Sequence, residues 1–480
     1  MYVKIRTAIG ALPLFAPITG MAHVFVQPYS LPVPFTMYAT GAGIALVLSF
    51  VAIGVFVTVP SVGRIERREG QGVALSAGLM LRSSRVVSAS LLLLCIATGL
   101  YGSSNAYRNF NMTFFWIFFV LGMAYVVAIF GDLYGVVNPW RSLVQGIERV
   151  GQLSGQGLVT YPARLGYSPA VLLYFAFIWL ELYGELRPFG LSVTLLAYTL
   201  LNILGVALFG KQSWFHYCEF FGVFFRIVGK LSPWSRSWEC PRPKACQMPL
   251  VGLVETHADR LSLVLFIMFM LSSTAIDGLH STKPWAEVFW RHLYPSIATW
   301  FSPPPGQQYV LAASLYYVWQ WCMLIVSPFV YLATFWAFVF LAKTFSGSRE
   351  GTSFLVQRFA FSLVPIAFAY HVSHYFTVLL SQGAQIIKLV SDPFGFGWNL
   401  FGTAQFDISP WMLDINVVWH AQVAIILIGH MAALYLAHVE ALAVFDSPRR
   451  AALSQLPMLL LMVLFTTLGL WILSLPLASG

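Results

Sequence analysis

The sequence predicts an all-α integral membrane protein, a polytopic bundle of about ten transmembrane helices. Of its 480 residues, 58% are hydrophobic and only 9% are charged. Several apolar runs reach the roughly 18–20 residues that a helix needs to cross a bilayer. Basic residues gather mainly in every second segment between these runs, as expected of a chain that crosses the membrane repeatedly. Composition and charge pattern therefore point to the same fold class.

The first 22 residues have the pattern of a secretory signal peptide. Lys4 and Arg6 precede a short apolar run, and Gly20-Met21-Ala22 provides the small residues of a cleavage site. Cleavage there would leave His23 as the mature amino terminus. The alternative is an uncleaved first helix interrupted by two prolines.

Residues 23–480 are predicted to form a single membrane domain with ten crossings. The expected crossings are residues 35–59, 86–102, 113–137, 168–186, 191–209, 261–277, 309–342, 355–380, 415–441 and 455–476. No segment between them is longer than about 50 residues, which leaves no room for a separate soluble domain.

The distribution of Lys and Arg predicts the orientation of these helices. With the mature amino terminus outside, twenty basic residues fall in cytoplasmic segments and five in outer ones. Cytoplasmic loops carry such an excess in membrane proteins. We therefore expect a bacterial plasma membrane protein with both mature termini on the outer side. The same bias explains the net charge of +9 without nucleic acid as a partner, so the expected partner is the lipid bilayer.

Three segments between the crossings have a character of their own. Residues 211–249 begin with aromatic and basic residues that suit an amphipathic helix lying in the inner interface. Residues 278–308 and 381–414 are rich in aromatic and turn residues. We expect these two to fold back as cap loops over the outer end of the bundle, with Trp at headgroup level.

Histidines are the principal candidates for a functional site. His371 and His374, three residues apart near the outer end of the eighth crossing, are neighbours on one helix surface. His420, at a matching depth on the ninth crossing, is a third imidazole. Imidazole suits transition metals, so these residues predict a copper or zinc site. The alternative for each histidine alone is a polar contact between helices.

Two further histidines extend this prediction. A processed His23 would chelate one copper ion through its free amine and its ring; the alternative is an amino terminus that binds nothing. His430 lies about 15 Å deeper than His420, near the membrane midplane. Facing His371 or His374, it would complete a bis-histidine haem b site for electron transfer.

Asp277 and His280 close the sixth crossing and are the catalytic candidates. A carboxylate and an imidazole three residues apart orient a ligand or transfer protons. The alternative is that Asp277 caps a helix end. Glu181 and Glu185, also near a membrane end, are predicted to be structural.

Several stretches resemble a bacterial family of polytopic membrane proteins labelled fenitrothion hydrolase. The matching stretches are Ala22-His23-Val24-Phe25, Leu31-Pro32-Val33-Pro34, Asn138-Pro139-Trp140-Arg141, Leu271-Ser272-Ser273-Thr274-Ala275-Ile276-Asp277-Gly278, Tyr370-His371-Val372-Ser373-His374-Tyr375 and Ser391-Asp392-Pro393-Phe394-Gly395-Phe396-Gly397-Trp398. The resemblance implies a membrane-bound hydrolase of organophosphorus triesters.

The predicted function is metal-dependent hydrolysis of a small-molecule organophosphorus ester at the outer face. A bound metal lowers the pKa of its water and polarises a phosphoryl oxygen, which triester hydrolysis requires. The alternatives are a redox subunit with haem b and a copper-handling or transport protein. No feature of the sequence identifies a partner subunit.

The charge bias gives a first testable prediction. A reporter that is active only outside the cytoplasm should work when fused after Gly480 and fail when fused after Arg349, because the two positions lie on opposite sides. Measured reporter activity in whole cells decides this, and the reverse pattern would overturn the predicted orientation.

Overall fold

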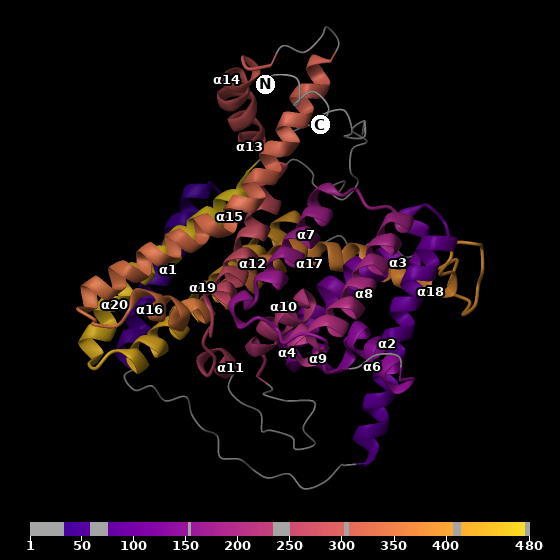
Figure 1. The fold of residues 1–480 in the computed structure, drawn as a ribbon. Helices are drawn as coiled ribbons and strands as arrows, with labels where there is room; N and C mark the ends of the chain where they lie inside the picture. The colour runs from indigo at the N-terminus through magenta and orange to yellow at the C-terminus, as the bar shows by residue number, and fades with distance from the viewer. Residues whose placement is uncertain are drawn as a thin grey trace, which may run out of the picture.

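The computed structural model describes residues 33–57, 75–151, 155–233, 250–301, 307–406 and 414–475. Every element of regular secondary structure in these ranges is helical, which confirms the predicted all-α fold (Figure 1). The predicted signal peptide, residues 1–22, and His23 lie outside the described residues.

Nine helices in the described ranges are long and apolar enough to cross a membrane. They are α1 (Phe35–Phe56), α2 (Leu75–Tyr101), the continuous helix formed by α3 (Phe110–Thr113), η3 (Phe114–Gly122) and α4 (Met123–Phe130), α8 (Pro188–Phe209), α12 (Leu261–His280), α15 (Gln308–Ser346), the segmented helix of α16 (Thr352–Phe359), α17 (Val364–Gln382) and α18 (Ile386–Ser391), α19 (Ile415–Val444) and α20 (Pro448–Ser474). Each matches one expected crossing. The tenth, residues 168–186, is α7 (Ser168–Tyr183), which is apolar but only 16 residues long.

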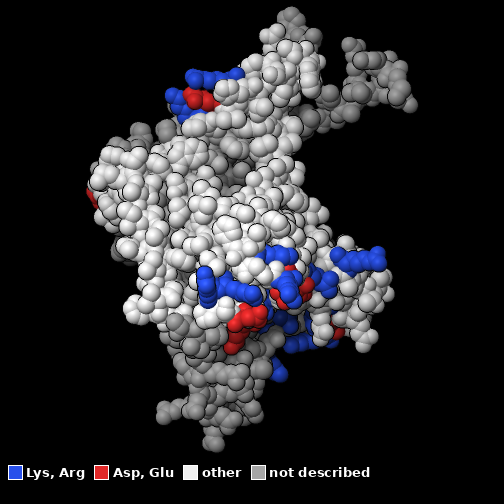
Figure 2. Space-filling model, turned by 90° about the vertical axis from the view of Figure 1, so that its left-hand side faces the viewer, with Lys and Arg blue, Asp and Glu red and all other residues white. Residues whose placement is uncertain are grey.

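Charged side chains lie at two levels of the molecule. Figure 2 shows one face on which Lys, Arg, Asp and Glu gather towards the top and towards the bottom, with a broad uncharged region between them. Such a region is the surface that a bilayer covers. The multi-pass membrane character predicted from the sequence therefore agrees with the folded surface.

Helix α12 is the central element of the bundle. It packs against α7, α15, α17 and α20. Of its apolar window, 67% is buried inside the protein, more than for any other of the nine membrane candidates. A helix enclosed by protein on most sides can carry polar side chains that find partners on several neighbours at once.

Helices α17, α19 and α20 pack closely through two glycines. A Cβ atom at Gly429 of α19 would overlap the Ala369 side chain and lie 2.9 Å from the Pro365 carbonyl oxygen of α17. A Cβ at Gly469 of α20 would overlap the Tyr370 ring, whose hydroxyl donates to the Phe465 carbonyl at 2.7 Å. Small residues permit this close approach of membrane helices.

Residues 211–249 were expected to contain a helix lying in the inner interface. In the part that the structure describes, residues 211–233, the helices pack inside the protein instead. The chain forms α9 (Lys211–Tyr217) and α10 (Phe220–Val228), and α10 packs against α4, α5 (Tyr134–Val137), α7 and α17. Six of its nine residues are buried: Phe220, Phe221, Val223, Phe225, Ile227 and Val228. A helix that is apolar on nearly all sides belongs inside the protein, whereas an interfacial helix keeps one polar face.

The two expected cap loops contain short helices. Residues 278–308 include the end of α12, α13 (Lys283–Glu287), η6 (Val288–Leu293) and α14 (Tyr294–Ala298). Within residues 381–414, α18 is followed by a turn in which Asp392 accepts hydrogen bonds from the Phe396 and Gly397 amides at 2.9 and 2.8 Å. The remaining short α-helices are α6 (Pro139–Arg149) and α11 (Val251–Val254).

The glycine contact between α17 and α19 gives a second prediction. Gly429→Ala should lower the free energy of unfolding by about 1–3 kcal/mol, because the added methyl group meets backbone and Ala369. Gly43→Ala in α1 is the matched control, since a Cβ at Gly43 meets no atom within 4 Å. Thermal unfolding of the purified protein in detergent measures both, and equal unfolding midpoints would refute the close contact.

Candidate functional site

Asp277 is the centre of a buried polar cluster. It lies one turn before the end of α12 and is 5% exposed. The His374 Nε2 atom donates to Asp277 Oδ2 at 2.8 Å, and the Tyr375 hydroxyl lies 2.7 Å from the same oxygen. A buried carboxylate needs such partners because it has lost its water. Two consecutive residues of α17 therefore neutralise and hold the Asp277 carboxylate.

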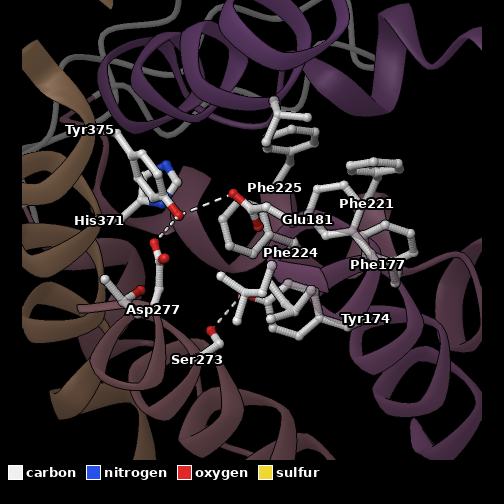
Figure 3. A pocket seen from close by; sticks show the side chains of 15 residues that line it. Tyr174, Phe177, Glu181, Phe221, Phe224, Phe225, Ser273, Asp277, His371 and Tyr375 are labelled. Atoms are coloured by element: carbon white, nitrogen blue, oxygen red, sulfur yellow. Dashed lines mark hydrogen bonds between the residues drawn. The ribbon is translucent and has the colours of Figure 1, made fainter. Parts of the chain in front are cut away.

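The Tyr375 hydroxyl connects Asp277 to a second carboxyl group, as the dashed lines in Figure 3 show. Glu181 Oε1 of α7 lies 3.0 Å from the hydroxyl oxygen. A phenol has one proton, so it donates to one carboxylate only. Both contacts are hydrogen bonds only when the other carboxyl group donates its own proton to the phenol oxygen. Because Asp277 is already paired with His374, we assign this proton to Glu181.

His280 belongs to the same end of α12. Its Nδ1 atom lies 2.7 Å from the Asp277 backbone carbonyl and 3.8 Å from Asp277 Oδ1. Its ring meets the edge of Tyr183 with centroids 6.0 Å apart. The expected pair of Asp277 and His280 is therefore brought together, and His374 is a closer imidazole partner of the carboxylate.

His371 lies one turn before His374 and Tyr375 and has different surroundings. Its ring is 5.0 Å from the Tyr375 ring centroid and 6.2 Å from that of Phe224. Its Nε2 atom is buried and has no hydrogen-bond partner in the described part of the chain. A buried polar atom without a partner is costly, so such atoms are candidates for contact with water or a ligand.

A cavity lies beside this cluster, between α7, α10, α12 and α17 (Figure 3). Its wall includes the polar side chains of Glu181, Ser273, Thr274, Asp277, His371 and Tyr375 and the aromatic rings of Tyr174, Phe177, Phe220, Phe221, Phe224 and Phe225. It offers about 30 Å³ to the centres of water-sized molecules. That is room for about two waters. A second, smaller cavity shares four lining residues with it: Tyr174, Phe224, Thr274 and His371.

The structure does not bring the other predicted histidines to this cavity. His420 is exposed; its Nδ1 atom lies 2.7 Å from the Asn416 carbonyl and its Nε2 atom 3.4 Å from the Tyr38 hydroxyl. His430 is buried, with Nδ1 2.9 Å from the Ile426 carbonyl and its ring beside Tyr370. His23 lies outside the described residues.

The predicted copper or zinc ligands, His371, His374 and His420, have separate surroundings in the described fold. In the ranges that the structure describes, no three His, Cys, Asp or Glu side chains are grouped to hold a metal ion. The Nε2 atom of His374 is hydrogen-bonded to Asp277, and the ring of His420 faces Tyr38 on α1. His371, His374 and His420 are therefore not arranged as one three-nitrogen site in the described fold.

The predicted haem b site would lie between α17, which carries His371 and His374, and α19, which carries His430. Helices α17 and α19 touch where Gly429, next to His430, meets Pro365 and Ala369. A porphyrin is a flat ring system about as thick as an aromatic ring, and this contact leaves no gap for one between the two helices. The haem b site of His430 with His371 or His374 stays a prediction, and this close contact does not favour it.

Glu181 and Tyr375 are the site residues that sequence reasoning missed. Glu181 was expected to be structural, yet it shares the Tyr375 hydroxyl with Asp277. An ionisable residue in an apolar run is a functional candidate by default, and Glu181 follows Phe175–Leu180 in such a run. That signal was present in the sequence, whereas the pairing across three helices was not.

The buried pair of His374 and Asp277 gives a third prediction. His374→Ala should lower the free energy of unfolding by about 3 kcal/mol, because it leaves a buried carboxylate without its partner. Adding Asp277→Asn to that variant should restore part of the loss, so the two effects will not add. Unfolding midpoints in detergent measure this cycle, with exposed His292→Ala as the control. Additive effects would contradict the pairing.

Comparison of the chain with protein-family models, with curated proteins and with solved structures gave no match. The resemblance to the fenitrothion hydrolase family therefore stays a prediction, and the geometry around Asp277 carries the functional proposal.

Proposed function

We propose that the protein binds and releases a proton at the cluster of Glu181, Tyr375 and Asp277, and that a small, largely apolar molecule in the aromatic cavity is linked to this exchange. The observation that carries the proposal is the Tyr375 hydroxyl between two carboxyl groups, 2.7 Å from one and 3.0 Å from the other. Its hydrogen bonds require one shared carboxyl proton. Loss of that proton breaks one of the two bonds.

Membrane physics supports this assignment. Carboxyl groups within membrane helices are expensive, and they mark proton relays and substrate pathways. Glu181 lines a cavity that has room for water and a largely aromatic wall. Water in the cavity can take up the proton, and the aromatic wall provides the apolar contact that small-molecule sites use. The nearby His371 is a second proton acceptor beside the same cavity.

The shared proton gives a fourth prediction. Infrared difference spectra of the full-length protein in liposomes, recorded across a pH range, should contain a C=O band of a protonated carboxylic acid. Glu181→Gln should remove this band, because the amide cannot titrate. Tyr375→Phe should change its frequency, because the hydrogen-bond partner is lost.

Exposed Glu185, four residues further on, provides the matched control. Glu185→Gln should leave the band unchanged. A spectrum without any titrating carboxylic acid band in the wild type would end this proposal.

A second candidate function is ester hydrolysis in the same cavity. The observation in its favour is the unpartnered Nε2 atom of His371 beside an aromatic wall. A neutral imidazole accepts a proton from water as a general base, and the rings suit an aryl ester. The resemblance to fenitrothion hydrolases and the predicted metal dependence belong to this candidate.

A fifth prediction tests hydrolysis directly. Purified protein incubated with a dialkyl nitrophenyl thiophosphate should release nitrophenolate, measured by its absorbance. His371→Ala should reduce the rate by about a hundredfold or more, as loss of a general base does, whereas exposed His292→Ala should not. Assays with chelator and with added zinc or copper test metal dependence. A rate equal in wild type and His371→Ala excludes this role.

A further inference from the structure

The hairpin of α9 and α10 enters the bundle from the end opposite Asp277 and turns back near the middle of the membrane. At its base, Lys211 pairs with Glu148 at 2.6 Å, and Lys230 donates to Thr256, before the start of α12, at 2.9 Å. At its tip, Glu219 accepts a hydrogen bond from Tyr198 at 2.9 Å.

Tyr198 fixes the depth of this tip. It is the eleventh of the 22 residues of α8, which is long and apolar enough to cross a membrane. At 1.5 Å per residue, it lies roughly 16 Å from either end of the helix. The Glu219 carboxylate is therefore near the midplane, and α9 and α10 form a re-entrant hairpin. Figure 1 shows this hairpin in the lower half of the bundle, with α7 and α12 extending above it. Re-entrant backbone is tolerated at membrane depth only inside protein.

Glu219 has four hydrogen-bond donors and no cationic partner among the described ion pairs. Besides Tyr198, they are Asn138 Nδ2 at 3.0 Å, the Gly222 amide at 2.7 Å and the Tyr134 hydroxyl at 3.4 Å. The side chain is 0% exposed. These neutral donors stabilise the carboxylate against the cost of burial, so the balance between its two protonation states is set by hydrogen bonds.

Arg226 of α10 and Asp132, between α4 and α5, form no salt bridge with Glu219 among the described ion pairs. Arg226 Nη2 donates instead to the His216 carbonyl at 2.7 Å. Asp132 Oδ1 accepts from the Gly135 amide at 3.0 Å. The amino terminus of α10 faces the carboxylate, because Glu219 caps α10, and its partner Asn138 in turn caps α6. The partial positive charge of the α10 terminus favours the anion without a fixed counterion.

Glu219 directly precedes two residues of the wall of the cavity that Glu181 also lines. Phe220 and Phe221 follow Glu219 directly and form part of the cavity wall. The ring centroid of Tyr198, the donor to Glu219, lies 5.6 Å from that of Phe220 and 5.9 Å from that of Phe221. Rotation of these two side chains would open the carboxylate to cavity water.

We propose that Glu219 is a second proton-binding site, and that Glu219 and Glu181 form the two ends of a proton path through the aromatic cavity. One proton passes from one carboxylic acid through cavity water to the other carboxylate, so charge and atoms balance. Glu181 lies at the Asp277 end of the bundle, and the base of the hairpin, with Lys211 and Lys230, lies at the other end. The proton path depends on the proposed proton exchange at Glu181. Proton binding at Glu219 does not depend on that exchange.

Infrared titration of the full-length protein in liposomes of phosphatidylethanolamine and phosphatidylglycerol tests the inference. The wild type should show two carboxylic acid bands with different titration midpoints; Glu219→Gln should remove one and Glu181→Gln the other. Tyr198→Phe should move the Glu219 midpoint up by about one pH unit, because the carboxylate loses a charge-stabilising hydrogen bond. If Glu219 only has a structural role and never binds a proton, Glu219→Gln will remove no carboxylic acid band from the spectrum. Exposed Glu255→Gln is the control.

Proton flux into the same liposomes, driven by a valinomycin potassium potential and measured with an internal pH dye, tests the path. Each single Gln variant should reduce the flux by about a hundredfold, and Glu219→Asp should recover part of it. Normal flux and an unchanged spectrum in Glu219→Gln would overturn the role of Glu219 and leave the Glu181 proposal standing. Loss of the Glu219 band without any effect of Glu181→Gln would overturn the Glu181 proposal and the path, but not Glu219 as a proton site.

Discussion

One phenolic hydroxyl joins the buried polar groups of three helices in this bundle. The Tyr375 hydroxyl lies between Glu181 on α7 and Asp277 on α12, so a single proton links three helices inside a membrane domain. Water cannot replace these partners in the apolar interior, and the cost of leaving them unmatched is several kcal/mol. The central position of α12 follows from the same constraint, because its polar end needs neighbours that bring an imidazole, a phenol and a second carboxyl group.

Much of the fold was predictable because bilayer thickness acts directly on the sequence. The apolar runs gave the nine long helices, and α7 differs only in being shorter than expected. The α9–α10 hairpin was not predictable in this way, since α10 has nine residues and is apolar nearly all round. Hydrophobic periodicity separates a surface helix from a buried one only when the helix has two different faces.

The site was predictable in part for an equally physical reason. The three-residue spacing predicted that His371 lies near His374 and that Asp277 lies near His280. Residues three apart on one helix are neighbours whatever the rest of the fold does. Spacing carries no information about which helices become neighbours or how each is rotated. His420 therefore turned out to face Tyr38, and Glu181 turned out to belong to the cluster.

The buried position of the α9–α10 hairpin also constrains how the chain assembles during synthesis. The hairpin packs against α4, α5, α7 and α8, which all leave the ribosome before it, and Phe224 also contacts His371 of α17, which is made much later. Until α17 has been inserted, α10 lacks its later neighbour on the side of Phe224. The hairpin is therefore an early-docking element, because all four donors to the carboxylate at its tip belong to upstream segments or to the hairpin itself. The downstream half of the bundle closes over a carboxylate that already has its partners.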